Sequence, residues 1–305
     1  MRAGHPTGVR VLAVVALAGL LLAGCAQPPP VERAPGLQPR FDAALAYVEG
    51  LRDADGRWPT AQVPLAMDIA VAAHLNVTSW PASVPVAQQV VWPAQEASLL
   101  SSLRALDAEA YAAAAANDEM RLERVRDRVL SRFDGRQFGD PVLLNDDAFA
   151  LLVLGHARVT WSTDFEPVVA GLLENQSEDG GWSWSVGGAG ETDMTGMVLS
   201  GLAEAGAIHR VDAQAVLGFL ATTSTASGGH ALLAGGEPNC NSTVWAILVQ
   251  ERLGLVASVA PWEFLLGLQN PDGGFGYTPG GPSNTLCSFE AATLLGMAVA
   301  HEVQI

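Results

Sequence analysis

Hydrophobic and polar positions divide most of the chain into two kinds of helical segment that follow one another in turn. Segments such as 166–176 (EPVVAGLLENQ) and 261–269 (PWEFLLGLQ) mix charged and apolar residues at helical spacing, which predicts helices with one face in water. Segments such as 193–206 (DMTGMVLSGLAEAG) and 287–300 (CSFEAATLLGMAVA) are apolar nearly all round, which predicts helices enclosed by other helices. The pattern therefore predicts outer helices paired with inner helices.

Glycine turns join each outer segment to the inner segment that follows it. The turns read DGRW at 55–58, DGRQF at 134–138, DGGW at 179–182, GGH at 228–230 and DGGF at 272–275. The steps from Trp182 to His230 and from His230 to Phe275 are 48 and 45 residues. A repeat of this length is typical of stacked helical hairpins. With one degenerate copy expected within 80–116, the array has about six hairpins and is expected to close into a ring.

Two of these turns resemble the glycine-tryptophan repeat of the prenyltransferase and squalene-cyclase superfamily. The matching stretches are LLENQSEDGGWSW at 172–184 and LLGLQNPDGGFGY at 265–277, with Gln176 and Gln269 at the glutamine position and Trp182 and Phe275 at the aromatic one. The resemblance covers residues 40–305. It implies an all-α (α/α)6 toroid, in which about six helical hairpins form inner and outer rings and one repeat is degenerate. The fold by itself implies no activity, because it also serves non-catalytic binders.

The N-terminus has the features of an export signal. Arg2 and Arg10 form a positive region before an apolar run at 11–22. Counted up to Gly24, the run has about 14 apolar or small residues, which are too few to span a bilayer, since that needs roughly 20. Leu22, Ala23, Gly24 and Cys25 resemble the bacterial lipobox, although a plain signal peptide with a chance cysteine remains the alternative. We expect a lipoprotein signal peptide at 1–24, lipidated Cys25 with a proline-rich tether at 25–39, and the toroid at 40–305.

Charge narrows the range of partners. The formal net charge is −16, and acidic proteins are poor ligands for nucleic acid and for anionic lipid surfaces. Attachment to the cell membrane is therefore expected to come from the lipid on Cys25, with the domain facing outside the cytoplasm. The partner beyond the membrane is expected to be an unidentified small molecule or protein.

The remaining cysteines, Cys240 and Cys287, are 47 residues apart, at the starts of consecutive predicted inner helices. Neighbouring helices pack with axes about 8–10 Å apart, so residues at equivalent positions can approach disulfide distance. In an oxidising compartment a disulfide is the first expectation. Buried free thiols and a ligand or metal site are the alternatives.

Protein prenyltransferases ligate zinc with an aspartate two residues before a cysteine, and with a later histidine. Here Thr285 stands two residues before Cys287, and His301 follows too soon. A catalytic zinc site needs three protein ligands, so no metal or cofactor is expected. The fold also occurs in cobalamin carriers, which leaves cobalamin as a minor possibility for the ligand.

Squalene and hopene cyclases carry an Asp-x-Asp-Asp motif whose middle acid protonates the substrate. Asp146 and Asp147 match the last two acids, whereas Leu144 occupies the position of the first. Either aspartate could instead cap the N-terminus of the inner helix. The resemblance thus gives Asp146 and Asp147 as catalytic candidates of an exported terpenoid cyclase-like or other toroid enzyme.

Several further acids lie at or near the predicted starts of inner helices and could surround one mouth of the ring. The candidates are Asp68, Asp193, Glu237 and Glu290, together with Glu191. They would attract a cation or a polyhydroxyl ligand and repel diphosphates. Because both family motifs are incomplete, we expect a non-catalytic ligand-binding or interaction module, with the enzyme based on Asp146 or Asp147 as the alternative.

Overall fold

A computed structural model describes residues 36–51, 103, 106–107, 109–110, 113–114, 117–159, 161 and 163–303. The chain divides into two units, residues 1–34 and 35–305, and the first unit lies wholly outside the described residues. The predicted signal peptide, the lipidation site Cys25 and the candidate acid Asp68 are therefore outside the described residues as well. So are the first predicted glycine turn and the inner segment expected after it.

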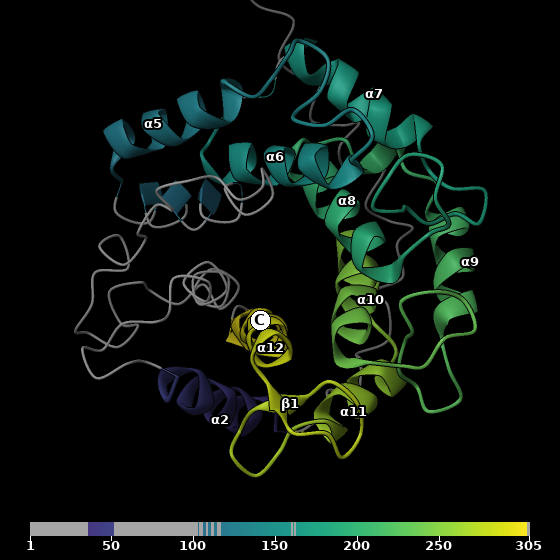
Figure 1. Ribbon diagram of the computed structural model, residues 1–305. Helices are drawn as coiled ribbons and strands as arrows, with labels where there is room; N and C mark the ends of the chain where they lie inside the picture. The colour runs from purple at the N-terminus through teal and green to yellow at the C-terminus, as the bar shows by residue number, and fades with distance from the viewer. Residues whose placement is uncertain are drawn as a thin grey trace, which may run out of the picture. The chain divides into compact units, whose positions relative to one another are not determined.

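Within residues 35–305, outer and inner helices alternate along the chain (Figure 1). The outer helices are α2 (Leu37–Glu49), α5 (Glu119–Leu130), α7 (Glu166–Glu174), α9 (Ala213–Thr223) and α11 (Val259–Gly267). The inner helices are α6 (Leu144–His156), α8 (Thr192–Glu204), α10 (Cys240–Arg252) and α12 (Thr285–Val303). Two 3-10 turns, η2 (Thr163–Phe165) and η3 (Ile208–Arg210), precede α7 and α9. The described residues thus contain four complete outer–inner pairs.

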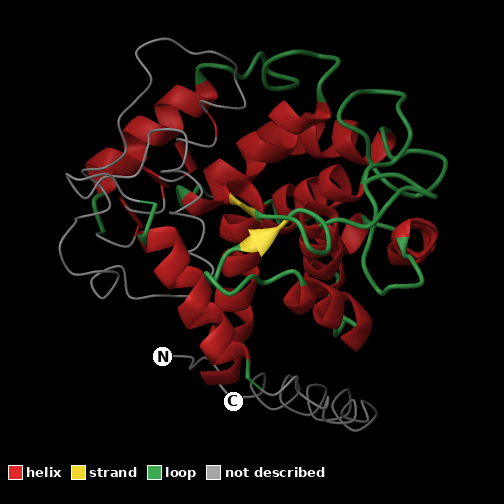
Figure 2. Cartoon of the chain, turned by 60° about the horizontal axis from the view of Figure 1, so that its bottom comes forward, coloured by secondary structure: helices red, strands yellow, loops and turns green. Residues whose placement is uncertain are grey.

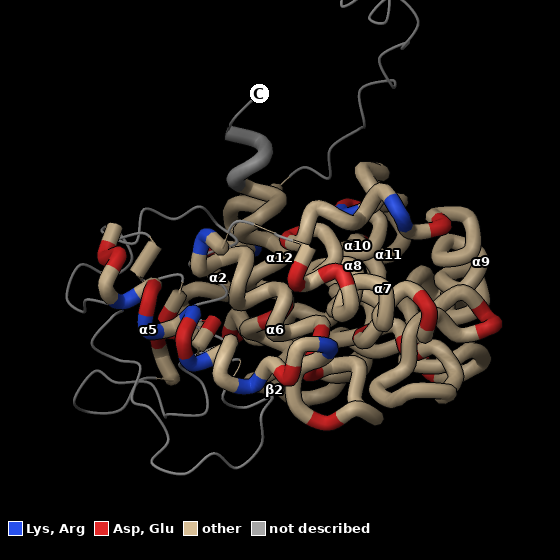
Figure 3. Tube along the Cα trace, turned by 90° about the horizontal axis from the view of Figure 1, so that it is seen from above, with Lys and Arg blue, Asp and Glu red and all other residues tan. Residues whose placement is uncertain are grey.

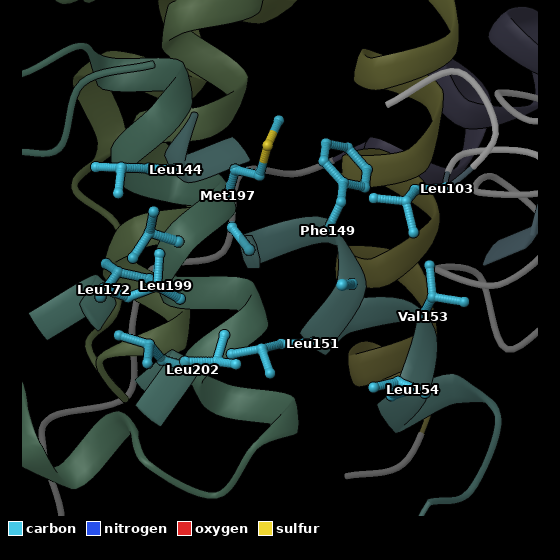
Figure 4. Packing of buried hydrophobic residues seen from close by; sticks show 14 of the residues in the cluster. Leu103, Leu144, Phe149, Leu151, Val153, Leu154, Leu172, Met197, Leu199 and Leu202 are labelled. Carbon is cyan, nitrogen blue, oxygen red and sulfur yellow. The ribbon is translucent and has the colours of Figure 1, made fainter. Parts of the chain in front are cut away.

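The inner helices pack side by side, α6 on α8, α8 on α10 and α10 on α12, and this packing explains their apolar sequences. Most residues of α6, α8 and α10 are buried, and the leucines of α6, α7 and α8 form a common core (Figure 4). Small residues permit the close approach. Gly201 of α8 lies against the backbone of Ala148, and Gly196 lies against the ring of Trp245, so a Cβ at either glycine would overlap its neighbour.

The glycine turns at 179–182 and 228–230 also pack on the outer helix of the next repeat, whereas Gly135 of the turn at 134–138 has nothing within 4 Å of an added Cβ. Gly180 lies against the carbonyl group of Ala215 in α9, and Gly228 lies in the same way against Ala260 in α11. Both glycines have φ near +90°, a conformation that L side chains adopt only at a cost, and neither position has room for a Cβ. Glycine is therefore required at these positions for two reasons, the positive φ and the close contact with the next outer helix.

The turn of the last repeat packs on the first outer helix. Gly273, with φ +90°, lies against the carbonyl group of Ala43 in α2. Gln269 donates a 2.9 Å hydrogen bond to the backbone oxygen of Arg40 and accepts one of 3.2 Å from its guanidinium. Helix α2 also packs along α12, as Figure 1 shows. It thus occupies the place of the next outer helix, and the two ends of the array meet as expected for a closed ring.

A short sheet leads into the last inner helix. Strands β1 (Phe275–Gly276) and β2 (Ser283–Asn284) pair antiparallel, with Phe275 opposite Asn284 (Figure 2). At the other end of the domain, α2 begins at Leu37, inside the segment 25–39 that the sequence assigned to the tether. Leu37 and Phe41 of this helix are buried, so the packed domain begins before residue 40.

Candidate functional site

The starts of the inner helices meet the loops of the following repeats in a regular hydrogen-bond pattern. The first residues of α6, α8 and α10 each donate a backbone N–H to a carbonyl of the next repeat's loop: Leu144 to Trp184 (3.1 Å), Thr192 to Leu232 (2.9 Å) and Cys240 to Tyr277 (2.9 Å). Each acceptor stands two residues after the residue at the aromatic position of its turn, which is Trp182, His230 or Phe275. The described repeats therefore join their loops and helix starts on one face, which we call the mouth.

A second pattern fixes each turn onto its own inner helix. The backbone N–H groups of Trp182, His230 and Phe275 donate to hydroxyl groups 13 residues later: Thr195 (2.9 Å), Thr243 (3.0 Å) and Ser288 (2.8 Å). Each of these hydroxyls stands at the fourth position of its helix. In the α5–α6 repeat the corresponding donor is Phe138, and its acceptor is the Asp147 carboxylate at 2.7 Å. Asp147 thus takes the place of a structural hydroxyl.

The catalytic candidates Asp146 and Asp147 are both buried at the start of α6. Burial raises the pKa of Asp147 to about 7, against the opposing effect of the hydrogen bond from Phe138. Burial also raises the pKa of Asp146, which accepts a 3.3 Å hydrogen bond from the backbone N–H of Asp140. The two carboxyl groups are therefore held in surroundings that favour their protonated forms, and both bind the loop that precedes α6.

The starts of α8, α10 and α12 bring together polar side chains from three repeats. Asn241 donates a 2.6 Å hydrogen bond to the Glu290 carboxylate and accepts one of 3.0 Å from the Cys287 thiol. Ser242 donates to the carboxylate of Asp193. We call this group the mouth cluster: Asp193, Asn241, Ser242, Tyr277, Cys287 and Glu290. The candidate acids Asp193 and Glu290 are thus brought to one site, and the structure adds Asn241 and Ser242, which the sequence analysis had not singled out.

Asp193 is the mouth-cluster acid with an unmet hydrogen-bonding capacity. Its Oδ1 is buried and has no hydrogen-bond partner among the described residues. Burial raises the pKa of Asp193 to about 6, and the negative charge of Glu191 acts in the same direction. Burial also raises the pKa of Glu191, whose carboxylate accepts the backbone N–H of Trp184. An oxygen with a free lone pair beside a network of bonded groups is suited to accept a donor from a ligand.

Helix capping shows that Cys240 and Cys287 are not equivalent in the repeat. Asn284 caps α12 by accepting the N–H of Cys287 at 3.0 Å, just as Asn239 caps α10 by accepting the N–H of Ser242 at 3.0 Å. Cys287 therefore corresponds to Ser242, and Cys240 stands two positions earlier in its helix. The expectation of equivalent positions was wrong, because the first residues of α10 and α12, Cys240 and Thr285, are 45 residues apart, two fewer than the spacing of the cysteines.

The two cysteines nevertheless meet, as free and buried thiols. The Cys240 thiol lies 3.8 Å from the backbone oxygen of Cys287, and the two side chains are hydrogen-bonded to each other. That bond and burial raise the pKa of Cys240, whereas the same bond lowers the pKa of Cys287. The disulfide predicted from the sequence is not formed in this structure.

The remaining mouth candidates are less central. Glu237 is exposed on the loop that leads into α10. His230, at the aromatic position of its turn, is buried beside the Thr223 hydroxyl at 3.1 Å, and burial lowers its pKa to about 4. Its imidazole therefore serves as a neutral core side chain. Over the described part of the chain, no group of three or more His, Cys, Asp or Glu residues is arranged to hold a metal ion.

Among the helices of the described residues, none is both long enough and apolar enough to cross a bilayer.

Sequence comparison identifies the family. The model of the prenyltransferase alpha-alpha toroid domain matches residues 148–304, just over half of the chain, so the chain belongs to this family. The all-α toroid predicted from the glycine turns is thereby confirmed. Comparison with curated proteins found no match.

Solved structures share the fold at low sequence identity. A polysaccharide lyase is similar with a TM-score of 0.60 and 11% identity, over 88% of this chain and 98% of the lyase. The type II terpene cyclase MstE from Scytonema is similar with a TM-score of 0.57 and 15% identity, over 87% and 98% of the two chains. Protein geranylgeranyltransferase-I from Candida albicans gives 0.53 and 12%, over 86% and 85%. At such identities the likeness concerns the fold alone.

Proposed function

We propose that this protein is a membrane-anchored extracytoplasmic lipoprotein whose toroid is a non-catalytic module that binds a ligand at the mouth cluster. The lipobox-like sequence ending at Cys25 supports the anchor. The observation that carries the binding role is Asp193 Oδ1, a buried acceptor without a partner in the described residues, on a carboxylate that also interacts with Ser242, next in sequence to the Asn241 that bonds Glu290. A polar group left in this state costs free energy that a ligand donor would recover.

The bonding of Asp147 supports a non-catalytic role. Its carboxylate accepts the Phe138 N–H at the place where other repeats use a threonine or serine hydroxyl. A side chain that holds the turn onto the helix has a sufficient structural role without chemistry.

The alternative is an exported terpenoid cyclase-like or other toroid enzyme that uses Asp146 or Asp147 as the acid. Its supporting observation is the burial that raises the pKa of both carboxyl groups, since an acid catalyst must keep its proton near neutral pH. Terpene cyclases and a polysaccharide lyase have the same fold, which makes either chemistry possible on this scaffold.

Native mass spectrometry tests the binding role. The mature chain with Cys25→Ser is exported, purified and mixed with a small-molecule extract of the producing cells. We expect a stoichiometric adduct that is lost in Asp193→Ala and retained in Asp147→Asn, which keeps the acceptor for Phe138. A clean apo mass would exclude a tightly bound small molecule. A new compound that the parent forms from the extract, but that Asp146→Asn and Asp147→Asn do not form, would establish the enzyme instead; chromatography must detect it, because cyclisation ended by loss of a proton leaves the mass unchanged.

Cell fractionation tests the anchor separately. We expect the parent protein in the membrane fraction and Cys25→Ser in the soluble exported fraction. Incorporation of labelled palmitate into the parent, but not into Cys25→Ser, is expected for a lipidated cysteine. Equal membrane association of both forms would contradict anchoring through Cys25.

A further inference from the structure

Three loops at the mouth present a large apolar side chain at the same repeat position, two residues after the turn aromatic. These are Trp184, Leu232 and Tyr277, which are 40%, 37% and 47% exposed. An exposed apolar side chain therefore recurs at the same position in three consecutive repeats. We call these three residues the apolar rim.

The rim residues are held by their backbones. The carbonyl oxygens of Trp184, Leu232 and Tyr277 accept the N–H groups of Leu144, Thr192 and Cys240, the first residues of the preceding inner helices. The N–H of Trp184 also donates to the Glu191 carboxylate. The rim is therefore fixed before any ligand arrives, and a fixed binding surface loses little conformational entropy on binding.

The apolar rim borders the mouth cluster. The phenol of Tyr277 lies within electrostatic range of Asp193 and Glu290, whose negative charges raise its pKa together with burial. Glu191 links Trp184 to the mouth cluster. Its carboxylate accepts the backbone N–H of Trp184, and its negative charge raises the pKa of Asp193. The phenol of Tyr277 thus lies near Asp193 and Glu290, and the backbone of Trp184 is bonded to Glu191 at the start of α8.

We propose that the apolar rim and the mouth cluster together bind a neutral oligosaccharide, with sugar rings against Trp184 and Tyr277 and hydroxyl groups donating to Asp193 Oδ1. This inference rests on the proposed binding function and names its ligand class. A sugar ring has an apolar C–H face with partial positive charge, which the negative face of an aromatic ring attracts, and an edge of hydroxyl donors.

Other ligand classes fit the two surfaces less well. A polyanion such as a diphosphate or an acidic polysaccharide would be repelled by Asp193, Glu191 and Glu290 and by a chain with a net charge of −16 (Figure 3). A hydrocarbon chain would cover the rim but would leave Asp193 Oδ1 buried without a donor, which costs free energy. A neutral polyhydroxyl ligand satisfies both the rim and the acids.

Calorimetric titration tests the proposal with maltohexaose, cellohexaose, mannohexaose and chitohexaose on the mature chain with Cys25→Ser. We expect at least one of them to bind with a Kd of about 1 mM or tighter. Trp184→Leu is expected to weaken that binding about tenfold, because it keeps an apolar side chain but removes the aromatic face. Leucine fits this place in the next repeat, at Leu232, and circular dichroism confirms that the variant is folded. Val256→Ala is the matched control, since Val256 is 60% exposed between α10 and α11, away from the mouth.

The outcomes separate the two proposals. Binding weakened by Trp184→Leu and unchanged by Val256→Ala supports the sugar site. Binding that Trp184→Leu leaves unchanged overturns its location. No binding of any of the four sugars, together with a non-carbohydrate adduct in the cell extract, overturns the sugar inference while the toroid remains a binding module. No binding and no adduct would overturn both proposals.

Discussion

Gly273 in the last described turn lies directly against the backbone carbonyl group of Ala43 in the first outer helix. The residues are far apart in sequence, yet they reproduce the contact that Gly180 and Gly228 make with the outer helices of their next repeats. The closing contact of the array is therefore built like its internal contacts. Because it joins α2 to the α11–α12 hairpin, it should be among the most sensitive positions of the domain.

We predict that Gly273→Ala lowers the free energy of unfolding by about 3 kcal/mol, through its positive φ and the overlap of a Cβ with Ala43. Gly280→Ala is the matched control, because Gly280 also has a positive φ, +74°, but nothing within 4 Å of an added Cβ. We expect it to cost only about 1 kcal/mol. Urea unfolding followed by circular dichroism measures both, and equal losses would show that the contact with Ala43 contributes nothing.

The second prediction concerns pH and Asp147. Its pKa is about 7 in the folded protein and near 3.8 in the unfolded chain, so between these values the folded state binds more protons. The stabilising contribution of Asp147 is therefore complete below about pH 4 and is lost as the pH rises through 7, at up to about 1.4 kcal/mol per unit. Asp147→Asn should remove this slope while retaining the acceptor for Phe138.

Other groups with perturbed pKa values, Asp146 and Glu191 among them, also make the stability depend on pH, so the comparison with the variant is essential. Asp193, with a pKa of about 6, lowers stability with rising pH as Asp147 does. His230, with its pKa lowered to about 4, has the opposite effect between about pH 4 and 6.5. In thermal melts from pH 4 to 8, the difference between parent and Asp147→Asn should change up to about pH 7 and then level off. Parallel curves would mean that the Asp147 carboxyl is not perturbed.

The third prediction compares two equivalent asparagines. Asn241 bonds both Cys287 and Glu290, so Asn241→Leu should cost about 2–3 kcal/mol by leaving polar groups unpaired at a buried site. Asn145, at the same position of α6, has an unpartnered Oδ1 among the described residues, and Asn145→Leu should cost less. Leucine suits the position itself, because Leu286 occupies it in α12. Chemical unfolding measures the loss of stability in both variants. A larger loss for Asn145→Leu than for Asn241→Leu would contradict the stabilising role of the Asn241 hydrogen bonds.

The fourth prediction concerns the thiols. The Cys240–Cys287 disulfide stays a prediction for the exported protein, where two thiols that meet across α10 and α12 can lose two electrons and two protons to a protein disulfide of the compartment. Peptide mapping of the mature protein without reduction should find the linked peptides. For a loop of this length, the disulfide would raise the free energy of unfolding by about 4 kcal/mol. Alkylation of both thiols without reduction would show that the reduced pair is the native state.

The periodicity of the sequence was sufficient to predict the toroid. Local features carry that information: apolar residues at helical spacing in α8, a glycine with positive φ in each turn that the structure describes, and a recurring aromatic such as Trp182 or Phe275. The start of α2 at Leu37 was missed because a proline-rich tether and the first turn of an outer helix have similar compositions. Only packing distinguishes them, through the burial of Phe41 and its neighbours.

The candidate site could be predicted only in part. The sequence placed Asp193 and Glu290 near helix starts, but it could not show that Asn241 lies 2.6 Å from Glu290, a residue 49 positions later. Such a contact depends on the rotation and offset of two helices, which are set by loop length and by packing on α8 and α12. The same dependence led to the wrong register of Cys240 and Cys287, whose spacing of 47 residues resembled the repeat without matching it.

By itself, the sequence determined that this chain forms paired outer and inner helices joined by glycine turns, because helical periodicity and positive φ are properties of short segments. Only the tertiary structure decided that α2 joins the last turn, that Asp147 replaces a structural hydroxyl, and that acids, thiols and exposed aromatic rings share one mouth. These are relations between repeats, fixed by how close-packed helices align, and no single repeat contains them.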